Sequence, residues 1–146
     1  LSHLNEKGFW DVANLSSKPL IATHSNSHEL CEHSRNLTNQ QLKTIKESKG
    51  IVGINFATAF LRPDGRMIPD TSLDIILKHT DHLIEHLGEE GVAIGSDFDG
   101  AVVPDQIKDL SGINLLKQRM YESNYGKEMI EKIFFKNWIN FLKKNL

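Results

Sequence analysis

At 146 residues, of which 39% are hydrophobic, the chain is long enough for one domain with a packed core and too apolar for a disordered protein. Seventeen basic and 19 acidic side chains give a formal charge of −2, so no broad basic field is available to bind nucleic acid or an anionic membrane surface. One cysteine, Cys31, excludes an internal disulfide framework and favours a reducing, cytoplasmic location. No apolar run approaches the roughly 20 residues of a membrane span, and the first residues do not resemble a secretion signal.

The first part of the chain predicts two strands with a helix between them. Residues 19–24 (PLIATH) form a short apolar run that ends in polar residues, which predicts a strand followed by a loop. Thr38 and Gln41 have the spacing of a capping box, so a helix is expected from there to about Ser48. Residues 51–56 (IVGINF) are apolar on both faces, which is typical of a strand buried between helices.

The second part continues the alternation. Apolar residues recur at helical spacing over 73–87, and Gly88 is expected to end this helix. Residues 92–95 (VAIG) predict a third strand, and a loop over 98–112 leads to further helix, with a final apolar stripe over 130–142. Alternating strands and helices with short connections indicate an α/β fold with a parallel sheet.

Polar side chains follow the predicted strands. Ligands of parallel α/β sheets bind beyond the carboxyl ends of the strands, which is where His24, Asn55 and Asp97 fall. Three strands, or four if residues 1–3 end another one, cannot close a barrel, which usually takes about 250 residues. The sheet is therefore either small and open or completed by a segment outside this chain.

Several of these side chains are capable of hydrolytic chemistry. His3 and His24 are candidate zinc ligands, because imidazoles held at strand ends bind zinc well; a surface position is the alternative for each. Asp97 could take a proton from a water on the metal, or it could cap the following turn, in which Asp99 is expected to be a turn residue. Arg35 could hold a substrate carboxylate with its planar fork, or lie solvated on the surface.

Other reactive side chains receive structural interpretations. His79, His82 and His86 lie off the apolar stripe of their helix and are expected to face solvent or a neighbouring element rather than the strand ends. Two nearby glutamates are expected to raise the pKa of the Cys31 thiol. Asn137 is expected to form a buried hydrogen bond that docks the last helix. Phosphate-binding loops, dinucleotide-binding turns and serine-nucleophile motifs are not present.

Four motifs occur in a defined order over essentially the whole chain. Residues 1–3 (LSH) and 23–26 (THSN) each carry a histidine at a predicted strand end, residues 35–37 read RNL, and residues 95–100 read GSDFDG. In this order and spacing they resemble the membrane (renal) dipeptidase family of zinc dipeptidases, peptidase family M19. The resemblance is specifically to the carboxyl-terminal half of the family's barrel.

The resemblance implies a fold as well as an activity. It implies an α/β chain that forms the carboxyl-terminal part of a (β/α)8 TIM-type barrel, like those of metal-dependent amidohydrolases, and that is incomplete on its own. Residues 1–146 would be a single partial domain, with parallel βα units and the site residues in 1–100 and carboxyl-terminal helices in 101–146.

The implied activity is hydrolysis of dipeptides by a metallopeptidase with two zinc ions, bridged by a glutamate and a water. His3 and His24 would be metal ligands, Asp97 the catalytic residue that manages the proton of the water, and Arg35 the anchor of the substrate carboxylate. Phe60, expected in the loop after the second strand, falls near an aromatic of the family's substrate pocket; packing in the core or a lid is the alternative.

Part of the family's site lies in the half that precedes Leu1: a His-x-Asp motif, the bridging glutamate and a further histidine. Because the chain also begins without methionine, we expect a missing amino-terminal half as its partner. The isolated chain is expected to bind zinc weakly, to be inactive, and to associate, for example as a homodimer, through its uncovered sheet edge. Two alternatives stay open: another metal-dependent amidohydrolase on the same barrel, or a non-catalytic binding module.

Overall fold

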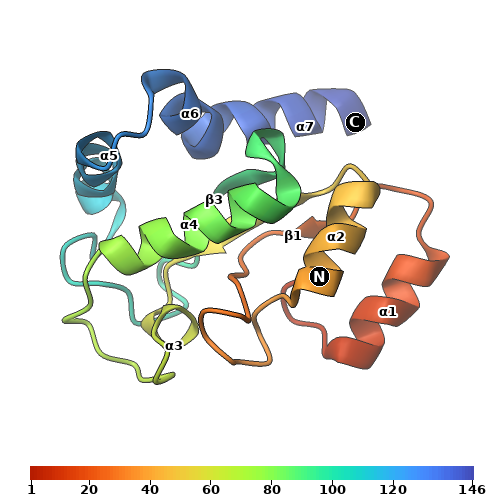
Figure 1. Cartoon of the computed structure of the whole chain (residues 1–146), viewed down its shortest axis with the longest axis horizontal. Coiled ribbons are helices and arrows are strands. Elements are labelled where there is room, and N and C mark those ends of the chain that lie inside the picture. The colour runs from red at the N-terminus through yellow and green to blue at the C-terminus, as the bar shows by residue number, and fades with distance from the viewer.

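A parallel sheet of three strands lies at the centre of the molecule (Figure 1). The computed structural model describes residues 1–146. The strands β1 (Ile21–Ala22), β2 (Ile51–Asn55) and β3 (Val92–Ser96) are hydrogen-bonded in that order and run parallel. Their carboxyl ends therefore open at one edge of the sheet, as the alternation of apolar runs predicts.

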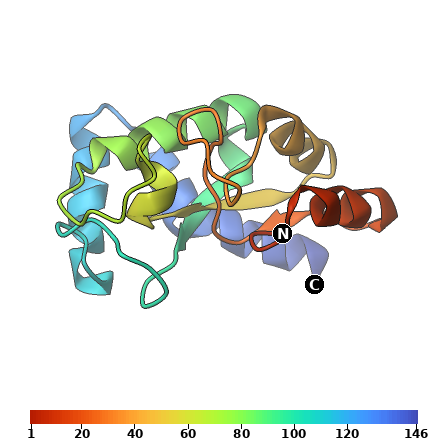
Figure 2. The same cartoon turned by 90° about the horizontal axis from the view of Figure 1, so that it is seen from below.

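Each connection between neighbouring strands contains a helix. The helix α2 (Asn39–Glu47) joins β1 to β2, and α4 (Asp74–Leu87) joins β2 to β3. Figure 2 shows both helices on the same side of the strands. This is the arrangement of two βα units in a parallel sheet, and it confirms the predicted fold class.

The predicted helix starts and ends are accounted for by side-chain and glycine geometry. The Thr38 hydroxyl accepts a hydrogen bond from the Gln41 amide at 3.3 Å, and the Gln41 side chain accepts one from the Thr38 amide at 2.9 Å, so the capping box of α2 is complete. At the end of α4, Gly88 adopts a φ of 83°, a conformation that a residue with a Cβ rarely takes.

The remaining elements surround this unit. They are α1 (Glu6–Leu15), α3 (Thr58–Leu61), short 3₁₀ turns at Glu89–Gly91 and Leu110–Gly112, α5 (Ile113–Glu122), α6 (Lys127–Glu131), a π-helical turn at Lys132–Lys136, and α7 (Asn137–Asn145). The last three form one continuous segment that runs alongside β3 (Figures 1 and 2).

Side chains of α7 attach it to β3. The buried Asn137 amide donates hydrogen bonds to the carbonyl oxygens of Glu89 at 2.6 Å and Val92 at 2.7 Å. The Trp138 indole donates to the Ile94 carbonyl at 2.9 Å. The expectation that Asn137 docks the last helix is confirmed.

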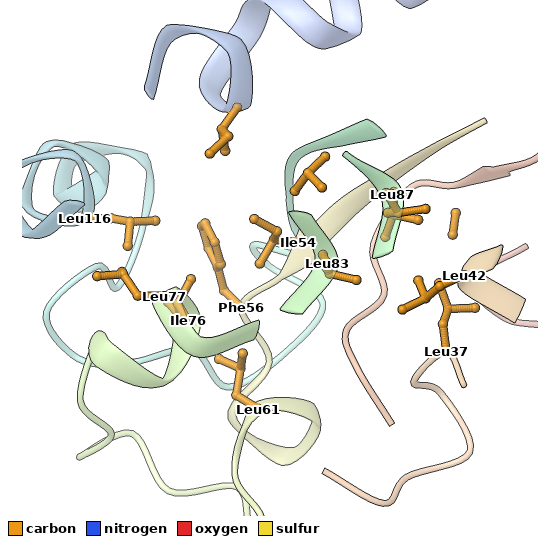
Figure 3. Packing of buried hydrophobic residues seen from close by; sticks show 14 of the residues in the cluster. Leu37, Leu42, Ile54, Phe56, Leu61, Ile76, Leu77, Leu83, Leu87 and Leu116 are labelled. Atoms are coloured by element: carbon orange, nitrogen blue, oxygen red, sulfur yellow. The ribbon is translucent and has the colours of Figure 1, made fainter. Parts of the chain in front are cut away.

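The core fills the space between the sheet and its helices (Figure 3). A single cluster of 22 buried apolar residues contains most of it, and all five residues of β2 are buried. Ile54 and Phe56, from β2 and the residue that follows it, pack among leucines of α4 such as Leu83 (Figure 3). This core fixes the strand ends on which the polar residues lie.

The structure differs from the sequence-based expectations in three local features. The helix α1 was not expected, and its start is capped by the Asn5 side chain, which accepts from the Gly8 amide. Residues 1–3 form no strand, although the Leu1 amino group donates to the Ile21 carbonyl at 2.6 Å. Phe60 lies in the short helix α3 rather than in a loop. None of the helices has the length and apolar character that a bilayer span requires.

Candidate functional site

The polar residues at the strand ends meet at one edge of the sheet. His24 lies two residues beyond β1, Asn55 ends β2, and Asp97 directly follows β3. Parallel pairing of Asn55 with Ser96 brings the last two side by side. His3 and Arg35 reach the same place from segments outside the sheet, as their contacts show.

The two histidines face each other through their Nε2 atoms. These atoms are 2.9 Å apart, and the ring planes are inclined by 63° with centroids 4.9 Å apart. Two nitrogens bound to one tetrahedral zinc ion, with bonds of about 2.0–2.1 Å, lie about 3.3 Å apart. A shift of a few tenths of an ångström would therefore let His3 and His24 share an ion, and the donor set fits zinc.

The amino-terminal segment holds His3 beside β1. The His24 amide donates to the Ser2 hydroxyl at 3.0 Å, next to the hydrogen bond from the Leu1 amino group to β1. The other ring nitrogen of His24, Nδ1, lies 2.8 Å from the Thr23 hydroxyl. Such a second contact orients an imidazole so that its free nitrogen points to a ligand.

Glycines in the neighbouring strands allow the backbone of Thr23 to approach closely. A Cβ atom at Gly53 would lie 2.0 Å from the Thr23 carbonyl oxygen, and one at Gly95 would lie 2.1 Å from it. Both positions therefore require glycine. This close approach fixes the backbone from which His24 projects.

Asp97 lies in a left-handed turn. Its φ is 67°, and Ser96 and Asp99 have φ values of 33° and 64°, a backbone conformation that costs free energy in residues other than glycine. The Asp97 carboxylate accepts a hydrogen bond from the Asn55 side chain at 3.0 Å. Asn55 thereby orients the carboxylate from the next strand, and Asp99 occupies the turn, as expected.

Arg35 is held by both the backbone and an aromatic ring. Its Nε donates to the Ser2 carbonyl at 2.7 Å, and one Nη lies 3.3 Å from Nε2 of His3. The guanidinium carbon lies 5.0 Å from the centre of the Phe60 ring, within the range of a cation–π contact. The positive charge is thus fixed beside the histidine pair rather than free in solvent.

These side chains border a cavity of about 570 Å³. His3, Arg35, Asp97 and Asp99 supply its polar side chains, and Phe60, Met67 and Val102 are among its apolar residues. His24 is outside the lining but contacts His3. The five residues singled out from the sequence, His3, His24, Arg35, Phe60 and Asp97, are therefore close neighbours at the opening of this cavity, which we call the mouth.

The electrostatics of the mouth favour a neutral imidazole at His24. Burial lowers the pKa of His24, and the charges of His3 and Arg35 lower it further, whereas the negative charge of Asp97 opposes them. Only the neutral form offers a lone pair to a metal ion. The direction of this shift therefore suits His24 to a role as a metal ligand.

Two buried asparagines, Asn26 and Asn36, support the mouth and received no role from the sequence. The Asn26 side chain exchanges hydrogen bonds with the Asn55 backbone, at 2.9 and 3.1 Å. The Asn36 amide donates to the Phe60 carbonyl at 2.8 Å. Both asparagines lie in the loop that follows the first predicted strand. An amide side chain at such a place can be buried only if it forms hydrogen bonds, and this is the signal by which the sequence could have identified them.

The fold and the mouth together define an α/β protein with candidate metal ligands at the carboxyl ends of parallel strands. Comparison with known sequences narrows this class. The profile of the membrane dipeptidase family, peptidase family M19, matches residues 1–145, and the chain belongs to this family.

Individual curated proteins are also similar to this chain. An uncharacterized protein of Klebsiella pneumoniae, from the region 5′ of pqqA, is 49% identical over 143 residues, which are 98% of this chain and 53% of that protein. An uncharacterized dipeptidase of Schizosaccharomyces pombe is 33% identical over 150 residues, covering 99% of this chain and 35% of that protein.

A solved structure is similar over the whole chain. The metallo peptidase of Rhodobacter sphaeroides, crystallised with a phosphinate mimic of the dipeptide L-Ala-D-Ala, superposes with a TM-score of 0.98 at 49% identity. The superposition covers 100% of this chain and 42% of the Rhodobacter chain. The chain thus spans about half or less of the length of these relatives, and its three strands correspond to part of a TIM-type barrel.

Proposed function

We propose that this chain provides the carboxyl-terminal part of the active site of a zinc-dependent dipeptidase. The observation that carries the proposal is the pair of Nε2 atoms 2.9 Å apart, flanked by Arg35 and Asp97 at one cavity, in a chain of the membrane dipeptidase family. The relative from Rhodobacter with its dipeptide mimic supports a dipeptide as the substrate class.

Each residue has a role that follows from its position. His3 and His24 would hold a zinc ion, and zinc, when bound, supplies the Lewis acidity that makes water nucleophilic near neutral pH. Asp97, held by Asn55, would accept the proton of the attacking water. Arg35 would bind the terminal carboxylate of the substrate with the donors that its contacts leave free.

The position of Arg35 would limit the length of the substrate. A guanidinium beside the metal-binding pair binds a carboxylate only one or two residues from the scissile bond, so short peptides are favoured. Phe60, against which Arg35 packs, would form the apolar wall for a substrate side chain.

We also propose that the isolated chain is inactive, since its two imidazoles are fewer than the three protein ligands usual for catalytic zinc.

The test is a chimera in which this chain replaces the matching 42% of the Rhodobacter peptidase. The chimera, loaded with zinc, is expected to hydrolyse L-Ala-D-Ala, while the 146-residue chain alone is not. His24→Ala in the chimera should reduce kcat/KM by more than about 100-fold, because loss of a metal ligand costs at least as much as loss of its supporting contacts. His28→Ala, at another half-buried histidine, is the matched control.

Substrates distinguish a dipeptidase from another amidohydrolase. Arg35→Ala should raise KM for dipeptides and leave hydrolysis of their carboxyl-terminal amides unchanged, whereas Arg66→Ala, at an exposed arginine, should change neither. Equal effects of Arg35→Ala on acids and amides would favour an amidohydrolase of other specificity. A folded chimera that binds the dipeptide mimic but no zinc would contradict the proposal and favour a binding module.

A further inference from the structure

A second group of metal-binding side chains lies on the surface of α4, away from the strand ends. His82, Glu85 and His86 stand at positions i, i+3 and i+4, which lie on one face of a helix. One ligand atom from each of the three lies within 4.8 Å of the other two. The two imidazole rings are stacked, with centroids 4.3 Å apart and planes inclined by 24°.

The hydrogen bonds of the two rings leave one nitrogen of each free. Nε2 of His82 lies 2.8 Å from the Asn39 side-chain oxygen, and Nδ1 of His86 lies 2.9 Å from the His82 carbonyl oxygen. Both oxygens only accept hydrogen bonds, so these nitrogens carry the protons. The neutral rings therefore offer a lone pair on Nδ1 of His82 and on Nε2 of His86.

This pattern is that of an oriented metal ligand. A histidine that binds a metal usually donates its second ring N–H to a carbonyl or carboxylate oxygen, which fixes the ring and raises its basicity. His79, one turn earlier on α4, shows the contrast: it is buried, and both of its nitrogens are engaged, with the Ser27 amide at 3.2 Å and the Leu61 carbonyl at 2.9 Å. His79 therefore cannot act as a ligand.

We propose that His82, Glu85 and His86 form a binding site for a divalent transition-metal ion, of the zinc, nickel or copper class, separate from the site at the strand ends. Two imidazole nitrogens and a carboxylate oxygen suit these ions, and water completes the coordination. The imidazoles are half-exposed and Glu85 is exposed, so an ion can enter from solvent and the rings can tilt toward it by rotation of their side chains.

The site would connect two helices. Glu85 and the two histidines span adjacent turns of α4, and the hydrogen bond from His82 to Asn39 reaches the first residue of α2. A bound ion would thus fix the surface where α4 crosses α2. Ligand binding to the folded state alone raises the stability of the protein, so the ion should raise its melting temperature.

The test measures metal binding by the full chain from which the strand-end histidines have been removed. The variant His3→Ala/His24→Ala is titrated with Zn²⁺ by calorimetry, and we expect it to bind about one equivalent. Adding His82→Ala/His86→Ala should abolish this binding and the accompanying rise in melting temperature, whereas adding His28→Ala should leave both unchanged. Asn39→Leu should weaken binding by about tenfold or more, through loss of ring orientation.

A spectroscopic measurement identifies the ligands directly. With Cu²⁺ in the His3→Ala/His24→Ala background, the electron paramagnetic resonance spectrum should show coupling to two imidazole nitrogens, which disappears in the His82→Ala/His86→Ala variant. Unchanged stoichiometry in that variant, or no bound metal in the background protein while it remains folded, would overturn the proposal. If the background variant does not fold, the unmodified chain serves instead, and His82→Ala/His86→Ala must lower its stoichiometry by one.

Discussion

The partners of the ring nitrogens decide the chemistry of each histidine in this chain. Nε2 of His3 and Nε2 of His24 face each other at the mouth of a cavity, and both nitrogens of His79 are used inside the core. Burial lowers the pKa of His79 to about 4, with the hydrogen bond to the Leu61 carbonyl acting in the opposite direction. His79 is therefore a neutral structural residue at physiological pH.

The lowered pKa of His79 makes the stability of the fold depend on pH. In the unfolded chain a histidine takes up a proton below about pH 6.5, whereas in the folded chain His79 does so only near pH 4. The free energy of unfolding should therefore fall as the pH drops from about 6.5 to 4, by up to about 3 kcal/mol from this residue. Above about pH 6.5 its contribution is constant.

Urea denaturation from about pH 4.5 to about pH 8 measures this dependence, because it covers most of the expected fall below about pH 6.5 and the constant region above it. His79→Gln keeps polar atoms for both hydrogen bonds and removes the titration, so its stability curve should be flatter below about pH 6.5. His28→Gln, at a half-buried position, is the matched control. Identical slopes for His79→Gln and the parent would contradict the assignment.

The role of a single residue could be predicted only where it depends on residues that are close in sequence. Asn137 interrupts an apolar stripe, so its buried hydrogen bonds could be expected from its own helix. His79 also lies off the stripe of its helix, but its burial depends on Ser27 and Leu61, which are distant in sequence. For Cys31, burial is the main cause of the raised thiol pKa, followed by the charge of Asp64, rather than the adjacent glutamates.

Among the elements, α2 depends on its capping box. Thr38→Ala removes the hydroxyl that accepts from the Gln41 amide and should lower the free energy of unfolding by about 1 kcal/mol. Thr44→Ala, in the middle of the same helix, is the control, because its hydroxyl only donates back to the Gln40 carbonyl. Thermal or chemical denaturation followed by circular dichroism compares the two, and an equal effect would argue against the cap.

The attachment of α7 to β3 depends on Asn137. Asn137→Leu would leave the Glu89 and Val92 carbonyls without their side-chain donor, and the free energy of unfolding should fall by about 2–4 kcal/mol. Asn140→Leu, at an exposed position one turn later, should change it by less than about 0.5 kcal/mol. If the Asn137→Leu variant were as stable as the parent, the hydrogen bonds of Asn137 would not be what docks the helix.

The elements with a strong local signal were predicted, and those defined by distant contacts were not. The periodic pattern of α4 and the continuous apolar runs of β2 and β3 identified them and the class of the fold. The short strand β1 was predicted from the apolar run 19–24, but its bounds, Ile21–Ala22, depend on its pairing with β2, which the sequence does not display. The π-helical turn before α7 leaves the apolar periodicity almost intact, so it could not be inferred.

At the scale of the whole molecule, the three-stranded sheet is smaller than the barrel to which the chain is similar. Unpaired strand edges and apolar surface promote contact between chains. Sedimentation of the 146-residue chain should therefore show association that increases with concentration, whereas the chimera with the Rhodobacter peptidase should form one defined species. A chain that stays monomeric over a wide range of concentration would contradict this expectation.

The composition of the mouth was predictable from four motifs, but its shape was not. The motifs identified His3, His24, Arg35 and Asp97, all of which the fold brings to one edge of the sheet. The cavity, in contrast, depends on the loop that follows α3 and on the left-handed turn after β3. These segments have no periodicity, and their conformation follows from hydrogen bonds such as that between Asn55 and Asp97.

His3 belongs to the tripeptide of residues 1–3, which lies outside the sheet and is attached to its neighbours by the hydrogen bonds of the Ser2 hydroxyl and carbonyl. Local detachment of this tripeptide would separate the two imidazoles and leave the 22-residue core intact. The affinity of the mouth for a cation is then governed by a local opening equilibrium rather than by global unfolding, and it decreases in proportion to the fraction of molecules in which the tripeptide is docked. Anything that clamps residues 1–3 onto β1 would tighten cation binding without touching either ligand.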